Sequence, residues 1–189
     1  MRIIVGITGA SGSVYGWRLL EKLRAQHGVE THLILSRSGE RTAFLEMGKA
    51  AGDFRALADH WHPVEDIGSS LASGSYPADA MIIAPCSIHT MSAIAHGISS
   101  NLIIRAADVT LKERRRLVLM VRESPLHLGH LRSMTSLAEM GAILAPPIPA
   151  FYHKPQTVAD LVEPSVDRVM ALAGTPADGA QVWDPKGAR

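Results

Sequence analysis

The first 26 residues carry a strand, a glycine-rich turn and a helix in direct succession. The apolar run from Arg2 to Ile7 predicts a buried strand, and Thr8-Gly9-Ala10-Ser11-Gly12 follows it. Apolar residues then recur at helical spacing between residues 14 and 23. The unpaired N–H groups at the start of such a helix attract anions, and the glycines let a ligand approach the backbone. The unit predicts a phosphate-binding turn, with a tight turn that binds nothing as the alternative.

The same strand-then-helix order recurs along the rest of the chain. We expect strands at 3–8, 31–36, 80–85, 117–121 and 142–145, and helices at 13–26, 38–48, 88–97, 101–114, 127–140 and 157–173. Residues 49–78 look less regular and include a Ser/Gly-rich loop at 69–76. Alternating strands and helices favour parallel strands. We therefore predict an α/β fold, a single-domain Rossmann-like open parallel sheet with helices on both faces.

Length and charge narrow the class of protein. A chain of 189 residues suits one domain, placed here at 1–175 and followed by a Gly-, Pro- and Ala-rich tail at 176–189. We expect Trp183 in that tail to dock on its own domain or on a neighbouring subunit. The net charge of +1 argues against nucleic-acid or membrane binding through bulk charge. The single Cys86 excludes an internal disulfide, and a cytoplasmic protein is expected.

Polar residues gather where the predicted strands end. In open parallel sheets, ligands bind beyond these carboxyl ends. Ser87 follows the third strand and is expected to cap a helix or to hold a ligand, whereas Cys86 beside it is expected to be a packed thiol. Arg122-Glu123 directly follows an apolar strand. Arginine suits phosphate and glutamate can move a proton, so this pair is the best functional candidate.

Two further segments carry polar groups after the fourth strand. His127 and His130 lie three residues apart on a predicted helix, but no third ligand with clear spacing follows, so capping or packing is favoured over a metal site. Tyr152 lies in a loop that follows three prolines, and its hydroxyl can bind a ligand. Arg168 on the next predicted helix is expected to face the same site.

Taken together, these segments resemble the UbiX-type flavin prenyltransferases. The matching stretches are Ile7–Gly12 with Tyr15-Gly16, Pro85-Cys86-Ser87, Arg105–Val109 with Leu111–Arg115, Arg122-Glu123 with Pro125-Leu126, and Pro149–His153 with Pro155-Gln156. They follow one another in the family's order from residue 2 to about residue 170. The Arg-Ala-Ala-Asp-Val and Pro-Ala-Phe-Tyr-His stretches are the most specific of them.

The resemblance implies an activity and its partners. The family joins a dimethylallyl group, usually from dimethylallyl monophosphate, to N5 and C6 of reduced FMN. Prenylated FMN then serves a UbiD-type decarboxylase that acts on aromatic or unsaturated acids, so ubiquinone synthesis and aromatic-acid breakdown are both open. The resemblance further implies a metal-independent transferase and a homododecamer with sites between subunits.

The resemblance also assigns roles to individual residues. The implied FMN contacts are Gly9, Ala10, Ser11, Ser36, Ser87, Ile88, His89, Thr90 and Arg122. The implied ligands of the prenyl phosphate are Lys112, Arg122, Tyr152 and Arg168. Glu123 matches a residue that handles protons at that phosphate, and Ser11 is expected to assist it. Glu46 matches a carboxylate near the reacting flavin edge, although the family's Glu-Thr-Asp is here Glu46-Met47-Gly48.

Two other functions compete with this one. A decarboxylase of the phosphopantothenoylcysteine type would carry Pro-Ala-Ser-Ala-Asn-Thr where this chain has Pro-Cys-Ser-Ile-His-Thr at 85–90, and the missing asparagine argues against it. A non-catalytic FMN-carrying subunit of a decarboxylase complex is the second alternative. Such a carrier needs no prenyl-phosphate site, so Lys112, Glu123, Tyr152 and Arg168 favour an enzyme.

Overall fold

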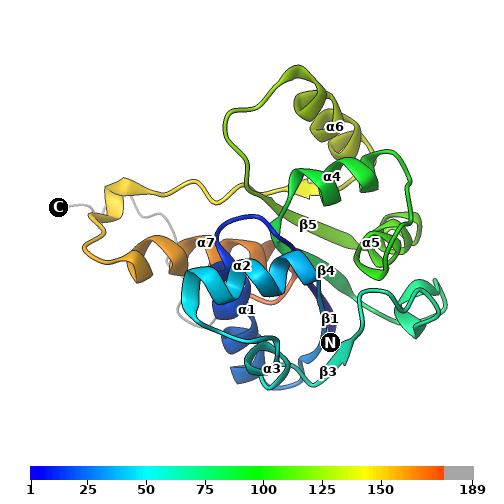
Figure 1. The fold of residues 1–189 in the computed structure, drawn as a ribbon, viewed down its shortest axis with the longest axis horizontal. Coiled ribbons are helices and arrows are strands. Elements are labelled where there is room, and N and C mark those ends of the chain that lie inside the picture. Colours follow the sequence, from blue (N-terminus) through cyan, green and yellow to red (C-terminus); the bar gives the residue numbers. More distant parts are fainter. Residues whose placement is uncertain (177–189) are drawn as a thin grey trace.

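The structure, a computed structural model, describes residues 1–176 and contains one six-stranded parallel sheet (Figure 1). Its strands are β1 (Arg2–Ile7), β2 (Glu30–Leu35), β3 (His60–His62), β4 (Ala80–Cys86), β5 (Arg116–Val121) and β6 (Ile143–Leu144). Their order across the sheet is β3-β2-β1-β4-β5-β6. The predicted open parallel α/β sheet is therefore confirmed. The tail from 177, with Trp183, lies outside the described residues.

Helices connect the strands and cover both faces of the sheet. The helices are α1 (Ser13–Ala25), α2 (Arg37–Met47), α3 (Ala51–Arg55), α4 (Ile88–Ala95), α5 (Leu102–Lys112), α6 (Leu128–Glu139) and α7 (Val158–Ala173), with 3-10 turns η1 (Ser70–Ala72) and η2 (Phe151–His153). Each helix that the apolar pattern predicted is present, with ends displaced by no more than two residues. No helix among residues 1–176 is long and apolar enough to cross a membrane.

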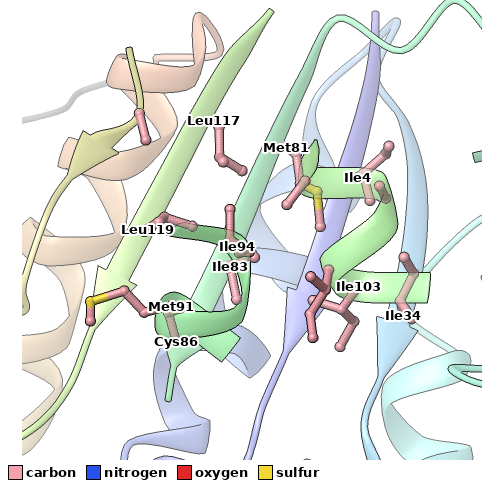
Figure 2. Packing of buried hydrophobic residues seen from close by; sticks show 14 of the residues in the cluster. Ile4, Ile34, Met81, Ile83, Cys86, Met91, Ile94, Ile103, Leu117 and Leu119 are labelled. Carbon is pink, nitrogen blue, oxygen red and sulfur yellow. The ribbon is translucent and has the colours of Figure 1, made fainter. Parts of the chain in front are cut away.

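Two apolar layers hold the helices on the sheet. On one face, strand residues such as Ile4, Met81 and Leu119 meet Ile94 of α4 and Ile103 of α5 (Figure 2). On the other face, α1 and α7 pack through the fully buried residues Leu19, Leu20, Leu23, Val166 and Met170. Because β1, β4 and β5 are covered on both sides, their sequences read as continuous apolar runs rather than alternating ones.

Residues 49–78 hold more regular structure than the sequence predicted. This stretch forms α3, the edge strand β3 and the turn η1. The five residues of α3 and the three of β3 are too few for a periodic apolar pattern. Since β3 pairs with β2 alone, its residues are half-buried or exposed and lack the apolar character of a central strand.

The strand order places one position where a ligand is expected. The chain runs outward from β1 through β2 to β3, and then returns to build β4, β5 and β6 on the other side of β1. The loops after β1 and β4 therefore diverge at their carboxyl ends, and open α/β sheets bind ligands at such switch points. These two loops contain the glycine turn and the Pro-Cys-Ser segment.

Candidate functional site

Hydrogen bonds join the ends of four neighbouring strands into one edge. Thr8 donates its hydroxyl to the Pro85 carbonyl at 2.8 Å and accepts from the Ser87 N–H at 2.8 Å. The N–H of Ser36 donates to Ile7 at 3.0 Å, and that of Arg122 donates to Cys86 at 3.1 Å. The loops after β1, β2, β4 and β5 are thus held side by side. The structure brings the predicted residues at these four strand ends to a single edge.

The glycine turn after β1 is tightly packed. A Cβ atom on Gly9 would lie 2.5 Å from the Cβ of Ser38 at the start of α2, so a larger residue cannot fit without movement of that helix. Gly12 has φ of 104°, a conformation that favours glycine, and it forms the N-cap of α1. The missing side chain at Gly9 therefore makes room for α2, whereas the sequence predicted that it makes room for a ligand.

Glu46 of α2 binds the start of α1. One of its carboxylate oxygens accepts from the N–H of Gly12 at 3.0 Å and from that of Ser13 at 2.8 Å. Burial raises the pKa of Glu46, but hydrogen bonds from the Ser11 side chain and from the two N–H groups outweigh it, so its pKa is lowered. The carboxylate is ionised at neutral pH. It accepts from N–H groups at the start of α1 for which the sequence predicted a phosphate as partner.

Glu46→Gln separates a capping role from a proton-transfer role. The amide offers one acceptor oxygen and no charge, so we expect the free energy of unfolding to fall by about 1 kcal/mol, or roughly 2–4 °C in Tm. Because the folded pKa is depressed, this contribution is present above the ordinary pKa of 4.5 and is lost as pH falls through the folded value. Thermal unfolding at neutral and acidic pH measures it.

Turnover of the same variant provides the second readout. If Glu46 also accepts a proton during the reaction, turnover falls by about 100-fold or more, far beyond the effect of slightly lower stability. Wild-type turnover would remove Glu46 from the chemistry and leave it as a helix cap. An unchanged Tm at both pH values would contradict the capping role.

Hydroxyl groups line the remaining strand ends. Ser36 caps α2 by accepting from the Gly39 N–H at 3.0 Å, and its oxygen lies 3.1 Å from that of Ser38. Ser87 caps α4 through the N–H of Thr90 at 3.3 Å and also contacts the Thr90 hydroxyl at 3.2 Å. Capping orients these side chains at the edge of the site. The same α4 terminus carries Ile88, half-buried, and His89, exposed.

Cys86 has no nucleophilic role in this arrangement. Its side chain is fully buried, and burial raises the pKa of the thiol to about 12. The thiol is therefore neutral at physiological pH and packs against α4, for example against Met91 (Figure 2). This confirms the predicted packed thiol.

Arg122 and Glu123 are exposed at the end of β5. The Arg122 side chain acts electrostatically on Tyr15 of α1: burial raises the pKa of the tyrosine, and the nearby guanidinium partly opposes that shift. Glu123 accepts from the N–H of Ser124 at 2.9 Å, which fixes the carboxylate beside the chain turn. A cation and an acid therefore stand together at the hydroxyl-lined edge.

Within one chain, Lys112 lies near the amino end of β5, on the side of the sheet opposite the carboxyl ends that form the candidate site. It ends α5 and precedes β5, whereas Arg122 follows β5, so the six residues of the strand, roughly 20 Å, separate the two. Lys112 forms an ion pair with Glu113 and approaches the loop at Gly74. One copy of the chain therefore does not bring Lys112 to the other predicted phosphate ligands.

Tyr152 and Arg168 belong to an extended arm and its return helix. The segment between β6 and α7 runs away from the sheet before α7 returns across α1 (Figure 1). Ion pairs of Lys22 with Glu163 at 2.6 Å and with Asp167 hold α7 in place, and Arg168 is exposed on it. Tyr152 is 60% exposed, and its neighbour Phe151 is 68% exposed.

His127 and His130 act locally. His127 caps α6 by accepting from the Gly129 N–H at 3.0 Å, and the rings of the two histidines lie 3.5 Å apart between centroids. These contacts match the predicted capping and packing.

Sequence patterns did not connect Glu46 with the glycine turn, because the two lie 34 positions apart and meet only through the packing of α2 on α1.

Comparison with known families gives a consistent result over nearly the whole chain. The family model described as Flavoprotein matches residues 1–170. The chain is 55% identical over 170 residues to a flavin prenyltransferase UbiX of Thauera aromatica, covering 90% of this chain and 87% of the relative. It is 53% identical over 169 residues to the flavin prenyltransferase UbiX of Escherichia coli K12, covering 89% of each chain.

Solved structures agree with the sequence relatives. A dodecameric FMN-dependent UbiX-like decarboxylase of Escherichia coli O157:H7 superposes with a TM-score of 0.95 at 44% identity, covering 97% of this chain and all of the other. AnUbiX (PadA1) in complex with FMN and dimethylallyl pyrophosphate has a TM-score of 0.94 at 44% identity, with 97% of each chain covered. A PPC decarboxylase at 23% identity and a TM-score of 0.59 shares the fold alone.

Proposed function

Because the chain belongs to the Flavoprotein family and, within it, to the UbiX flavin prenyltransferases, we propose that it transfers a dimethylallyl group to reduced FMN. Bonds form at N5 and C6 of the flavin, and the phosphate of the donor leaves. The protein is a transferase, and the proposed donor is dimethylallyl monophosphate. The relative solved with FMN holds dimethylallyl pyrophosphate, so the number of donor phosphates is part of the test.

The observation that carries this proposal is the Arg122–Glu123 pair beside the hydroxyl-lined strand ends. A protein that only carries FMN requires phosphate and ribityl contacts, which Ser36, Ser87 and Thr90 can supply. It has no use for an exposed acid next to an exposed guanidinium at the same edge. Loss of an allylic phosphate calls for both, because negative charge develops on the leaving oxygen and must be neutralised.

The donor set at the edge fits FMN. The hydroxyls at the ends of β2 and β4 suit the polar ribityl chain, and Arg122 suits the phosphate or the flavin carbonyl region. Gly9, Ala10 and Ser11, in the turn after β1, are the proposed contacts for the flat ring system at this switch point of the sheet. Ile88 and His89 complete this set at the start of α4. Reduced FMN, when bound, supplies the nucleophile for the allylic carbon.

The chain's own residues then handle charge and protons. Glu123 donates a proton to the bridging oxygen of the leaving phosphate, with Ser11 assisting. Arg122, Lys112, Arg168 and Tyr152 stabilise the charge on the released phosphate. N5 releases its proton when the first bond forms, which restores the proton that Glu123 gave. Closing the second bond adds one proton to the remaining double bond of the prenyl group and removes one from C6, and Glu46 takes the proton from C6. One allylic phosphate and one reduced FMN thus give prenylated FMN and inorganic phosphate, with no oxidant required.

The complete site needs more than one copy of the chain. Lys112 lies at the amino ends of the strands, away from the other proposed phosphate ligands. Tyr152 belongs to η2, in the arm that runs away from the sheet. The arm exposes the apolar side chains of Ile148 and Phe151, and the start of α7 exposes that of Val158; all three would be covered in an assembly. We infer that neighbouring subunits contribute these residues, in a homododecamer like that of the Escherichia coli O157:H7 relative.

The proposal also covers the metal requirement, the catalytic domain, the compartment and the recipient of the product. The proposed reaction is metal-independent, because four cationic or hydroxyl side chains take the place of a metal at the phosphate. We propose that the catalytic domain spans residues 1–175 and that the protein works in the cytoplasm. The product is proposed to pass to a UbiD-type decarboxylase. The test is oxygen-free incubation with reduced FMN and either donor, followed by mass analysis of the flavin.

A further inference from the structure

A second cluster of polar side chains lies at the amino ends of β2 and β3. The proposed flavin site lies at the opposite, carboxyl ends of the strands. Glu30 and His32 are two residues apart on β2, so their side chains share one face of the strand. His60 of β3 is the register partner of His32, and the two rings stack with centroids 4.7 Å apart. Strand geometry therefore places one carboxylate and two imidazoles at a common point.

Two of the three distances between possible ligand atoms in this cluster are close to those expected around a metal ion. One oxygen of Glu30 lies 3.2 Å from Nε2 of His32 and 3.2 Å from Nε2 of His60. All three ligand atoms lie within 4.8 Å of one another, the one such group of three or more found among residues 1–176. Tetrahedral zinc with bonds of about 2.1 Å would hold its ligand atoms roughly 3.4 Å apart.

Outer contacts fix the orientation of each ligand. The other oxygen of Glu30 pairs with Arg2 at 2.9 Å, which leaves the first oxygen to face the histidines. His32 is 3% exposed, and its Nδ1 lies 3.1 Å from Nε2 of His62, whose Nδ1 lies 3.0 Å from the Ser69 hydroxyl. If the Nδ1 atoms of His32 and His62 both carry protons, this series of hydrogen bonds leaves Nε2 of His32 unprotonated, with a lone pair that can bind a metal ion. Such outer hydrogen bonds are typical of metal-bound histidines.

We propose that Glu30, His32 and His60 bind a zinc ion, with water in the fourth position. Two imidazoles and a carboxylate favour zinc over magnesium or calcium, which prefer oxygen ligands alone. His60 is 53% exposed, so solvent reaches the site, and the Tyr76 hydroxyl, 3.1 Å from Nε2 of His32, can contact the bound water.

The position of the site indicates a structural or regulatory role rather than a catalytic one. β2 has six residues, so roughly 20 Å of strand separates Glu30 from Ser36, which lies at the proposed flavin site. β3 is a three-residue edge strand that pairs only with β2, and the ion would tie it to the sheet. Zinc that binds only the folded protein raises its stability by mass action.

The experiment measures zinc binding to tag-free, metal-stripped full-length protein by competition with a chromophoric chelator. Wild type is expected to bind one zinc per chain, with a rise in Tm that zinc-depleted buffer reverses. His60→Gln and Glu30→Gln should each weaken binding by at least 100-fold, and His62→Gln by about 10–100-fold. The matched control is His127→Gln, which disrupts the other histidine pair and should bind zinc as wild type does.

Two outcomes overturn the proposal. Wild type that binds no zinc at micromolar concentration shows that the cluster is only a packed histidine group. Equal zinc affinity in His60→Gln and wild type places any bound zinc elsewhere on the chain. Because His60 is exposed and lies outside the flavin edge, its variant should fold and keep its prenyl transfer rate, which confirms that lost binding does not reflect a damaged protein.

Discussion

Glu123→Gln should retain FMN and lose turnover by roughly 10²–10⁴-fold, the range that a positioned general acid contributes. The glutamine fits the same space beside Ser124 but cannot give a proton to the leaving phosphate oxygen. FMN affinity is measured by fluorescence quenching, and turnover by prenylated flavin formed per minute. Retained binding together with lost turnover assigns the effect to chemistry rather than to folding.

Glu139→Gln is the matched control for that variant. Glu139 is an exposed carboxylate at the end of α6, away from the strand ends, and its substitution should change neither binding nor turnover. If Glu123→Gln turned over like this control, Glu123 would have no part in the reaction. Phosphate departure would then need another proton source.

Lys112→Met should lower turnover by about 100-fold, because a cation is removed from the charge that develops on phosphate. The methionine keeps the length and apolar stem of the side chain. Lys112 is exposed at the turn before β5, so stability should change little. Initial rates over a range of dimethylallyl monophosphate concentrations separate weaker donor binding from slower chemistry.

Mixed oligomers of Lys112→Met and Glu123→Gln test the shared site directly. If each site takes Lys112 from one subunit and Glu123 from another, random assembly of equal amounts leaves about a quarter of the sites intact. Co-expressed mixtures should then recover about a quarter of wild-type turnover, although each variant alone is nearly inactive. No recovery would place both residues in one chain's site, against the separation across β5.

Much of the fold was predictable because the sheet is buried on both faces. Continuous apolar runs mark β1, β4 and β5, and glycine or serine turns mark where they end. The edge strand β3 escaped prediction because its sequence, His-Trp-His, lacks that pattern and gains its place only by pairing with β2. The zinc cluster escaped for the same reason, since its members meet across two strands.

The sequence predicted the positions of only those site residues that directly follow a strand. The loops after β1, β2, β4 and β5 meet because parallel strands share an edge, so Ser36, Ser87 and Arg122 lie together as expected. Lys112 could not be placed in this way, because it precedes its strand instead of following it. The contact of Glu46 with the glycine turn depends on how α2 packs, which no local pattern encodes.

The most direct test of the central claim is the mass of the flavin after reaction. Purified protein is incubated without oxygen with reduced FMN and dimethylallyl monophosphate, or with the pyrophosphate in parallel, and the flavin is extracted. We expect a product heavier than FMN by one C5H8 unit, formed faster from the preferred donor and absent with Glu123→Gln. Unmodified FMN with both donors, while the Escherichia coli relative is active alongside, would contradict the proposed transferase and favour an FMN carrier.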